Sequence, residues 1–271
     1  YMFKIGFRLA NAVYKFDESI DLDDDAFGIL RNSYAQFGLG VPTGIDLPGE
    51  TSGINGGMAT EKLLDLTIGQ FDTYTPLQMA QYVATIANGG SRIQPHVVKE
   101  IREPSTDGTT MGPLVTEIGP TVLNRIHNTQ EQIDQVKKGM SRVYYGSNGS
   151  ARSYFGDAPY QAAGKTGTAQ VVYYDTKKEN WGDQTINSTH IGFAPFDKPE
   201  IAYAVIMPWA PFYNGQYEST GTILAREVVD AYYEIKNKKK EEEVDSSNLQ
   251  TIKPAFSETL IDEDSKEATN E

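Results

Sequence analysis

Residues 161–170 read Gln-Ala-Ala-Gly-Lys-Thr-Gly-Thr-Ala-Gln, and the interpretation of this stretch decides the fold. Gly164-Lys165-Thr166 matches the end of a nucleotide-binding P-loop, in which another glycine stands five residues before the second one. That position holds Pro159, which has no N–H and a fixed φ, so it cannot help to cradle a phosphate. No apolar strand precedes the stretch and no helix signature follows it. These features argue against a P-loop in this stretch.

Three segments in this part of the chain have the composition of strands. They are rich in β-branched and aromatic residues and are bounded by turn residues: Gln161–Val172, Thr189–Pro195 and Ile201–Pro208. The last two are joined by a linker of hairpin length, whereas Tyr173–Ser188 reads as a long loop. Strands joined in this way, with helices before and after them, predict an α/β (α+β) fold with an antiparallel sheet covered by helices.

Helices are predicted on both sides of these strands. Thr75 is a natural N-cap, Pro76 suits the first helical position, and Gly89-Gly90 stops the helix. Apolar residues at helical spacing predict the other helices. The expected ranges are Tyr1–Tyr14, Thr75–Asn88, Thr129–Tyr144 and Ile223–Lys236. Phe37–Gly53, rich in glycine and proline, is predicted to be an ordered loop.

The composition excludes several classes of function. A net charge of −13 argues against a nucleic-acid-binding surface, which needs an excess of lysine and arginine. The chain has no cysteine, and His96, His127 and His190 lack the spacing of metal ligands, so we expect no metal site and no cofactor. The longest apolar run, near Ile201–Met207, is too short to span a membrane.

The character of the sequence changes after residue 236. From Glu241 onward there are ten acidic and two basic residues and few aromatic ones. Such a segment has too little apolar area to offset the entropy lost on ordering. We therefore expect a folded region over 1–236 and an acidic disordered tail over 237–271.

Several segments together resemble one family. The chain carries, in this order, Thr43–Glu50 (TGIDLPGE), Ile68-Gly69-Gln70 with Thr75–Gln78 (TPLQ), Gly149-Ser150-Ala151, Ala163–Gln170 (AGKTGTAQ) and His190–Pro195 (HIGFAP). The third motif of serine penicillin-recognising enzymes is Lys-Thr-Gly. The set resembles the C-terminal part of the transpeptidase domain of class B (monofunctional) high-molecular-weight penicillin-binding proteins. Two positions depart from the pattern: Phe71 replaces a usual glycine and Ser150 a usual threonine.

This resemblance implies a serine β-lactamase/D,D-peptidase-like fold and a role for each residue of the motif. The acyl-donor stem peptide of peptidoglycan, or a β-lactam, would bind along the Lys165 strand as an added strand. Gly167 would allow close approach, and the Thr168 N–H would be one of two oxyanion-hole donors. Lys165 would supply positive charge for the terminal carboxylate, and the Thr166 and Thr168 hydroxyls would hydrogen-bond it.

Two motifs of this family are missing from the sequence. No serine is followed three residues later by lysine, and Ser-x-Asn occurs only at Ser246-Ser247-Asn248, where we regard it as a chance match. We therefore expect an N-terminally truncated domain that does not form the serine ester by itself. We also expect the apolar faces of Leu9, Leu77 and Val83 to be uncovered.

The resemblance also implies where the parent enzyme works. It would act at the extracytoplasmic face of the bacterial cell membrane, held by an N-terminal anchor outside this sequence, with proteins of the elongation or division complex as partners. The alternative is a non-catalytic module that binds muropeptide or β-lactam, or a scaffold of the cell-wall complex. A serine β-lactamase shares Lys-Thr-Gly, but the Gly-Gln and Thr-Pro-Leu-Gln segments argue against it.

Overall fold

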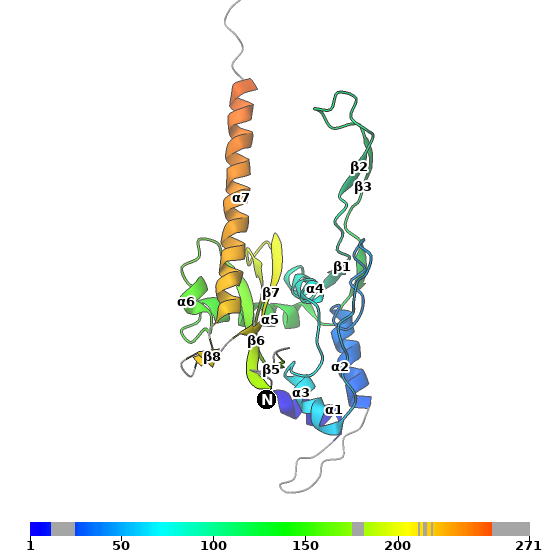
Figure 1. Cartoon of the computed structure of the whole chain (residues 1–271), viewed down its shortest axis with the longest axis vertical. Helices are drawn as coiled ribbons and strands as arrows, with labels where there is room; N and C mark the ends of the chain where they lie inside the picture. Colours follow the sequence, from blue (N-terminus) through cyan, green and yellow to red (C-terminus); the bar gives the residue numbers. More distant parts are fainter. Residues whose placement is uncertain (12–24, 175–181, 211, 214–215, 218, 251–271) are drawn as a thin grey trace, which may run out of the picture. The chain divides into compact units, whose positions relative to one another are not determined.

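The computed structural model describes residues 1–11, 25–174, 182–210, 212–213, 216–217 and 219–250 (Figure 1). It divides into two compact units, Tyr1–Glu227 and Val228–Glu271, and the boundary falls inside the last helix. The helices are α1 (Met2–Leu9), α2 (Asp25–Gln36), α3 (Thr60–Thr67), α4 (Pro76–Ala87), α5 (Gln130–Tyr145), α6 (Arg152–Phe155) and α7 (Thr220–Gln250). The strands are β1 (Ser91–Ile93), β2 (Glu100–Arg102), β3 (Leu114–Glu117), β4 (Val122–Arg125), β5 (Ala163–Tyr173), β6 (Asp183–Ala194), β7 (Ile201–Ala210), β8 (Phe212–Tyr213) and β9 (Gln216–Tyr217).

Two of the helices that pack against the sheet, α4 and α5, start at the same kind of cap. The Thr75 hydroxyl accepts from the Gln78 N–H at 3.2 Å, and the Gln78 side chain accepts from the Thr75 N–H at 2.9 Å. Thr129 and Gln132 repeat this arrangement at the start of α5. Both are capping boxes, which satisfy two main-chain donors reciprocally. The predicted helices over Thr75–Asn88 and Thr129–Tyr144 are confirmed.

Strands β5, β6 and β7 form an antiparallel sheet in that order. The prediction of an α+β fold with such a sheet is therefore confirmed. The predicted long loop over Tyr173–Ser188 is wrong at its end, because β6 begins at Asp183 and pairs with Tyr173. Ile186 and Ser188 are buried on one face of β6, so the segment alternates in burial like a strand. Residues 175–181 lie outside the described residues.

The two faces of this sheet pack against different sets of helices, and α5 contributes to both, with Met140 on one face and Tyr144 on the other. On one face, Ala163, Phe193 and Ala202 join Val83, Ile86 and Ala87 of α4 in one apolar cluster. On the other face, His190 contacts Tyr144 of α5, Phe155 of α6 and Thr222 of α7. The expectation that Val83 would be uncovered is wrong, because its exposed fraction is 0%. Leu9 and Leu77 are half-buried.

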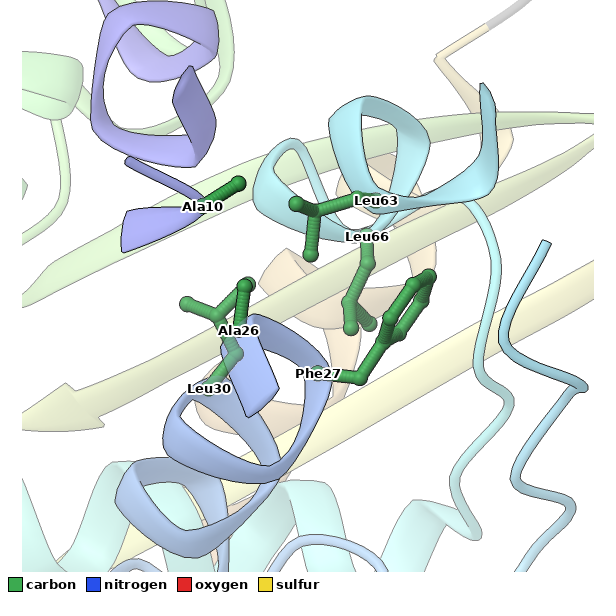
Figure 2. Packing of buried hydrophobic residues seen from close by; sticks show 6 residues of the cluster. All are labelled: Ala10, Ala26, Phe27, Leu30, Leu63 and Leu66. Carbon is green, nitrogen blue, oxygen red and sulfur yellow. The ribbon is translucent and has the colours of Figure 1, made fainter. Parts of the chain in front are cut away.

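A second apolar cluster joins the first three helices (Figure 2). Its buried members are Ala10, Ala26, Phe27, Leu30, Leu63 and Leu66. Leu63 and Leu66 lie one turn apart on α3 and are almost completely buried, which fixes α3 against α1 and α2. This cluster anchors the segment that follows α3.

A narrow ribbon is the other prominent feature of the first unit. β1 pairs with β4 at its base, and β2 pairs with β3 further out, both antiparallel (Figure 1). At its base the Asp46 carboxylate accepts from the N–H groups of Val97 and Val98 at 2.8 and 3.0 Å. Most residues of β2 and β3 are exposed to solvent.

The first and last helices differ in length from their predicted ranges. α1 ends at Leu9 instead of Tyr14, and residues 12–24 lie outside the described part of the chain. α7 continues to Gln250 instead of ending near Lys236, so the first part of the expected disordered tail is helical. Pairs such as Glu234 and Lys238, at helical spacing and 2.7 Å apart, favour this continuation. The rest of the tail, 251–271, lies outside the described residues.

Candidate substrate-strand site

Strand β5 carries the predicted site residues at an edge of the sheet. Its sheet neighbour is β6, and the described residues place no strand on its other side. Lys165 and Thr168 are exposed there, and Thr166 and Gly167 are half-buried. By register Lys165 lies opposite Ile191 and Thr168 opposite Ser188. The four predicted residues therefore lie together along one open edge.

The hydrogen bonds along β5 show which of its main-chain groups point outward from this edge. The carbonyls of Val171 and Tyr173 accept bonds from residues of the β6 side. The carbonyls of Thr166 and Gln170 instead accept from side chains, Lys165 Nζ at 2.8 Å and Gln70 Nε2 at 2.9 Å. Residues of an antiparallel strand direct their N–H and C=O alternately to its two sides.

Thr168 is therefore one of the residues whose N–H and C=O face the open edge. It lies midway between Thr166 and Gln170, whose carbonyls already mark that side. This is the orientation that an oxyanion-hole donor on this strand requires, because the donor must point at the ligand and not into the sheet.

A small polar group surrounds the exposed end of the Lys165 side chain. Lys165 Nζ lies 3.5 Å from the Thr166 hydroxyl, which in turn lies 3.1 Å from the Ser150 hydroxyl. Ser150 stands just before α6, in the segment that sequence analysis matched to a Gly-Thr-Ala element. A hydroxyl at this position bonds the motif strand directly, so the replacement of threonine by serine retains the contact.

Two glycines of the motif are required by packing inside the protein. A Cβ at Gly164 would clash with the Tyr144 hydroxyl, and a Cβ at Gly167 would clash with the Thr189 side chain. Close approach of neighbouring groups is a common reason for glycine in a strand. Gly167 thus has a role in cross-strand packing in addition to the predicted approach of substrate.

Beneath the strand lies a buried polar network that sequence analysis did not identify. The Tyr144 hydroxyl lies 2.6 Å from His190 Nε2 and 2.7 Å from the Tyr203 hydroxyl. His190 Nδ1 lies 3.1 Å from the Thr222 hydroxyl, and Tyr144 stacks on Phe155 with ring centroids 4.1 Å apart. These groups come from β6, β7 and three helices, so no short sequence window contains them.

Burial controls the charge state of this network. It lowers the pKa of His190 to about 4, and the positive charge of Lys165 adds to the effect. Burial also raises the pKa of Tyr144 well above its ordinary value. Both side chains are therefore uncharged at neutral pH and serve as hydrogen-bonding supports for the strand.

The described residues contain no group of three or more His, Asp or Glu residues that could hold a metal ion. Within the same residues, no helix combines the length and the apolar character needed to cross a membrane.

Comparison with known proteins gives a consistent result. The family model described as penicillin binding protein transpeptidase domain matches residues 12–234. Penicillin-binding protein 2A of Bacillus subtilis is 43% identical over 93% of this chain and 35% of its own length. The peptidoglycan D,D-transpeptidase MrdA of Acinetobacter baumannii is 35% identical over 75% of this chain and 30% of its own.

A solved structure shares the fold over most of the chain. Penicillin-binding protein 2B of Streptococcus pneumoniae superposes with a TM-score of 0.77 at 31% identity. The match covers 87% of this chain and 37% of that protein. The chain therefore spans about a third of the length of the relatives it matches.

Proposed function

The chain belongs to the penicillin-binding protein transpeptidase family, and we propose that it provides the substrate strand of a class B peptidoglycan D,D-transpeptidase. The observation that carries the proposal is the open edge of β5, on which Thr166, Thr168 and Gln170 direct their main-chain groups outward. An extended peptide can add to such an edge as a further antiparallel strand.

The direction of the bound peptide follows from charge. Lys165 is exposed near the start of β5, and its positive charge favours the terminal carboxylate of the stem peptide there. An antiparallel peptide with its carboxyl end there has its amino-terminal residues toward Gln170. The carbonyl of its penultimate residue then lies near the Thr168 N–H, which is directed to stabilise negative charge on that oxygen.

The chemistry proposed for the complete domain is acyl transfer through a serine ester. The serine oxygen attacks the carbonyl of the penultimate residue, the bond to the last residue breaks, and that residue leaves with a proton on its nitrogen. The amine of a second stem peptide then attacks the ester and releases the serine. The present sequence has no Ser-x-x-Lys, so we propose that this chain alone performs neither step.

Incubation with benzylpenicillin followed by an intact-mass spectrum tests this proposal. A penicillin opens its ring on the nucleophile and adds its whole mass, because nothing leaves. We expect no adduct on this chain, and a one-to-one adduct on a penicillin-binding protein that contains Ser-x-x-Lys, measured in parallel. An adduct on a single serine of this chain would show that it holds its own nucleophile and would overturn the proposed inactivity.

Because peptidoglycan lies outside the cytoplasmic membrane, we place the activity at the outer face of that membrane, beside proteins of the elongation or division complex. Cell fractionation with an antibody against this chain tests the location. Recovery of the whole antigen from the cytosol would contradict it.

A further inference from the structure

One hydrogen bond on the open edge of β5 comes from a distant part of the chain. Gln70 Nε2 donates to the main-chain carbonyl of Gln170 at 2.9 Å, across 100 residues of sequence. Gln70 is half-buried, and its side chain, which comes from outside β5, occupies the Gln170 carbonyl as a hydrogen-bond acceptor on this edge. It therefore changes what the edge can offer to an added peptide.

The main chain holds Gln70 in place. The Gln70 N–H donates to the Asp65 carbonyl and the Gly69 N–H to the Leu66 carbonyl, both at 3.0 Å. Gly69 has φ of +78°, so these bonds form a Schellman motif that ends α3. Leu66 itself is fixed in the apolar cluster of Figure 2. The Gln70 side chain thus extends from a well-supported helix end.

The Gln70–Gln170 bond lies on the part of β5 that the upstream residues of the proposed peptide would reach. An antiparallel peptide whose carboxylate lies near Lys165 meets Thr166 first, then Thr168, then Gln170. Outward-facing residues are two apart, so each of these offers the next pair of hydrogen bonds. The Gln70 amide occupies the place at Gln170 that the next main-chain N–H of the peptide would take.

We propose that Gln70 is a specificity-determining residue that ends the peptide ladder at Thr168. This inference rests on the proposed function. The main chain of β5 then recognises the carboxyl-terminal dipeptide of the donor, and the upstream stem residues leave the edge at Gln170. Donor peptides that share this dipeptide but differ upstream therefore bind β5 with similar affinity.

Binding of labelled peptides of two lengths tests the inference. The probes are a tripeptide and a pentapeptide, each ending in two D-alanines with a free carboxylate and carrying a fluorophore at the amino end, followed by anisotropy. On the unmodified chain we expect the two dissociation constants to agree within about twofold. In Gln70→Ala the pentapeptide should gain about 2- to 10-fold over the tripeptide, the factor that one main-chain hydrogen bond contributes.

Ile68→Ala is the matched control, because it removes a side chain that is 52% exposed at the same helix end but keeps the Gln70 amide that binds the Gln170 carbonyl. It should bind the two peptides as the unmodified chain does. A melting curve for each variant checks that α3 and the sheet stay folded.

If Gln70→Ala leaves the ratio of the two affinities unchanged, or if the unmodified chain already prefers the pentapeptide, the role of Gln70 is overturned while the proposed substrate strand stands. If no form of the chain binds either peptide, the proposed function fails, and the inference about Gln70 fails with it.

Discussion

The β5–β7 sheet and the β2–β3 ribbon are built from the same antiparallel ladder, but their surroundings differ. Phe193 in the sheet is completely buried between α4 and its neighbours, whereas Ile101 and Leu114 in the ribbon are each 50% exposed. A two-stranded hairpin without a packed face is at best marginally stable in water. The sheet can therefore hold a site in fixed geometry, and the ribbon depends on its attachment at Asp46 and β1.

The largest expected effect comes from the packed side of this comparison. Phe193→Ala removes a ring with no exposed surface from the cluster with α4, and such truncations cost about 3–5 kcal/mol because a cavity remains. Urea unfolding followed by circular dichroism measures the change in the free energy of unfolding. A loss below about 1 kcal/mol would mean that the face of the sheet is loosely packed.

A smaller effect should come from the buried histidine on the opposite face. The folded pKa of His190 is about 4, below the ordinary value of 6.5, so the unfolded chain binds the proton first as pH falls. The stabilising contribution is complete above pH 6.5 and is lost progressively toward pH 4. Between about pH 7.5 and 5 the free energy of unfolding should fall by about 2 kcal/mol from this group alone.

The control for this pH effect is His190→Gln, which cannot take up a proton in this range. It should be less stable at neutral pH because the bonds to Tyr144 and Thr222 are disturbed. Its free energy of unfolding should nevertheless vary less between the same two pH values. An equal pH dependence in both proteins would show that other groups cause it.

The smallest effect is expected in the ribbon. Ile101→Ala removes an exposed side chain that contributes little packing, so the free energy of unfolding should change by no more than about 0.5 kcal/mol. The measurement is the same urea titration as for Phe193→Ala. A loss comparable to that of Phe193→Ala would erase the contrast between the two ladders and indicate that the ribbon packs in solution.

Local signals in the sequence predicted much of the fold. The cap at Thr75 and the apolar spacing after Thr129 placed two helices within one residue of their starts, because both signals depend on neighbouring residues only. The start of β6 was missed, since the charged residues before it read as a loop. The continuation of α7 beyond Lys236 was missed because its polar composition predicts disorder, whereas charge pairs at helical spacing favour the helix.

The candidate site was predictable in part for the same reason. Lys165 to Thr168 form a short motif and could be located by inspection. The partners that position this motif, such as Gln70, Tyr144 and His190, come from elements far apart in sequence. Only the folded chain brings them together, so no pattern within a window could assign them.

The ribbon also has a practical consequence for anyone who wants to observe this protein at work. Its tip is an exposed turn in which the Asp107 carboxylate accepts from the N–H groups of Thr109 and Thr110 and from the hydroxyls of Ser105 and Thr110. Exposed tips of this kind tolerate insertions. A fluorescent reporter or an epitope inserted beside Gly108 would mark the molecule while leaving the β5 edge accessible.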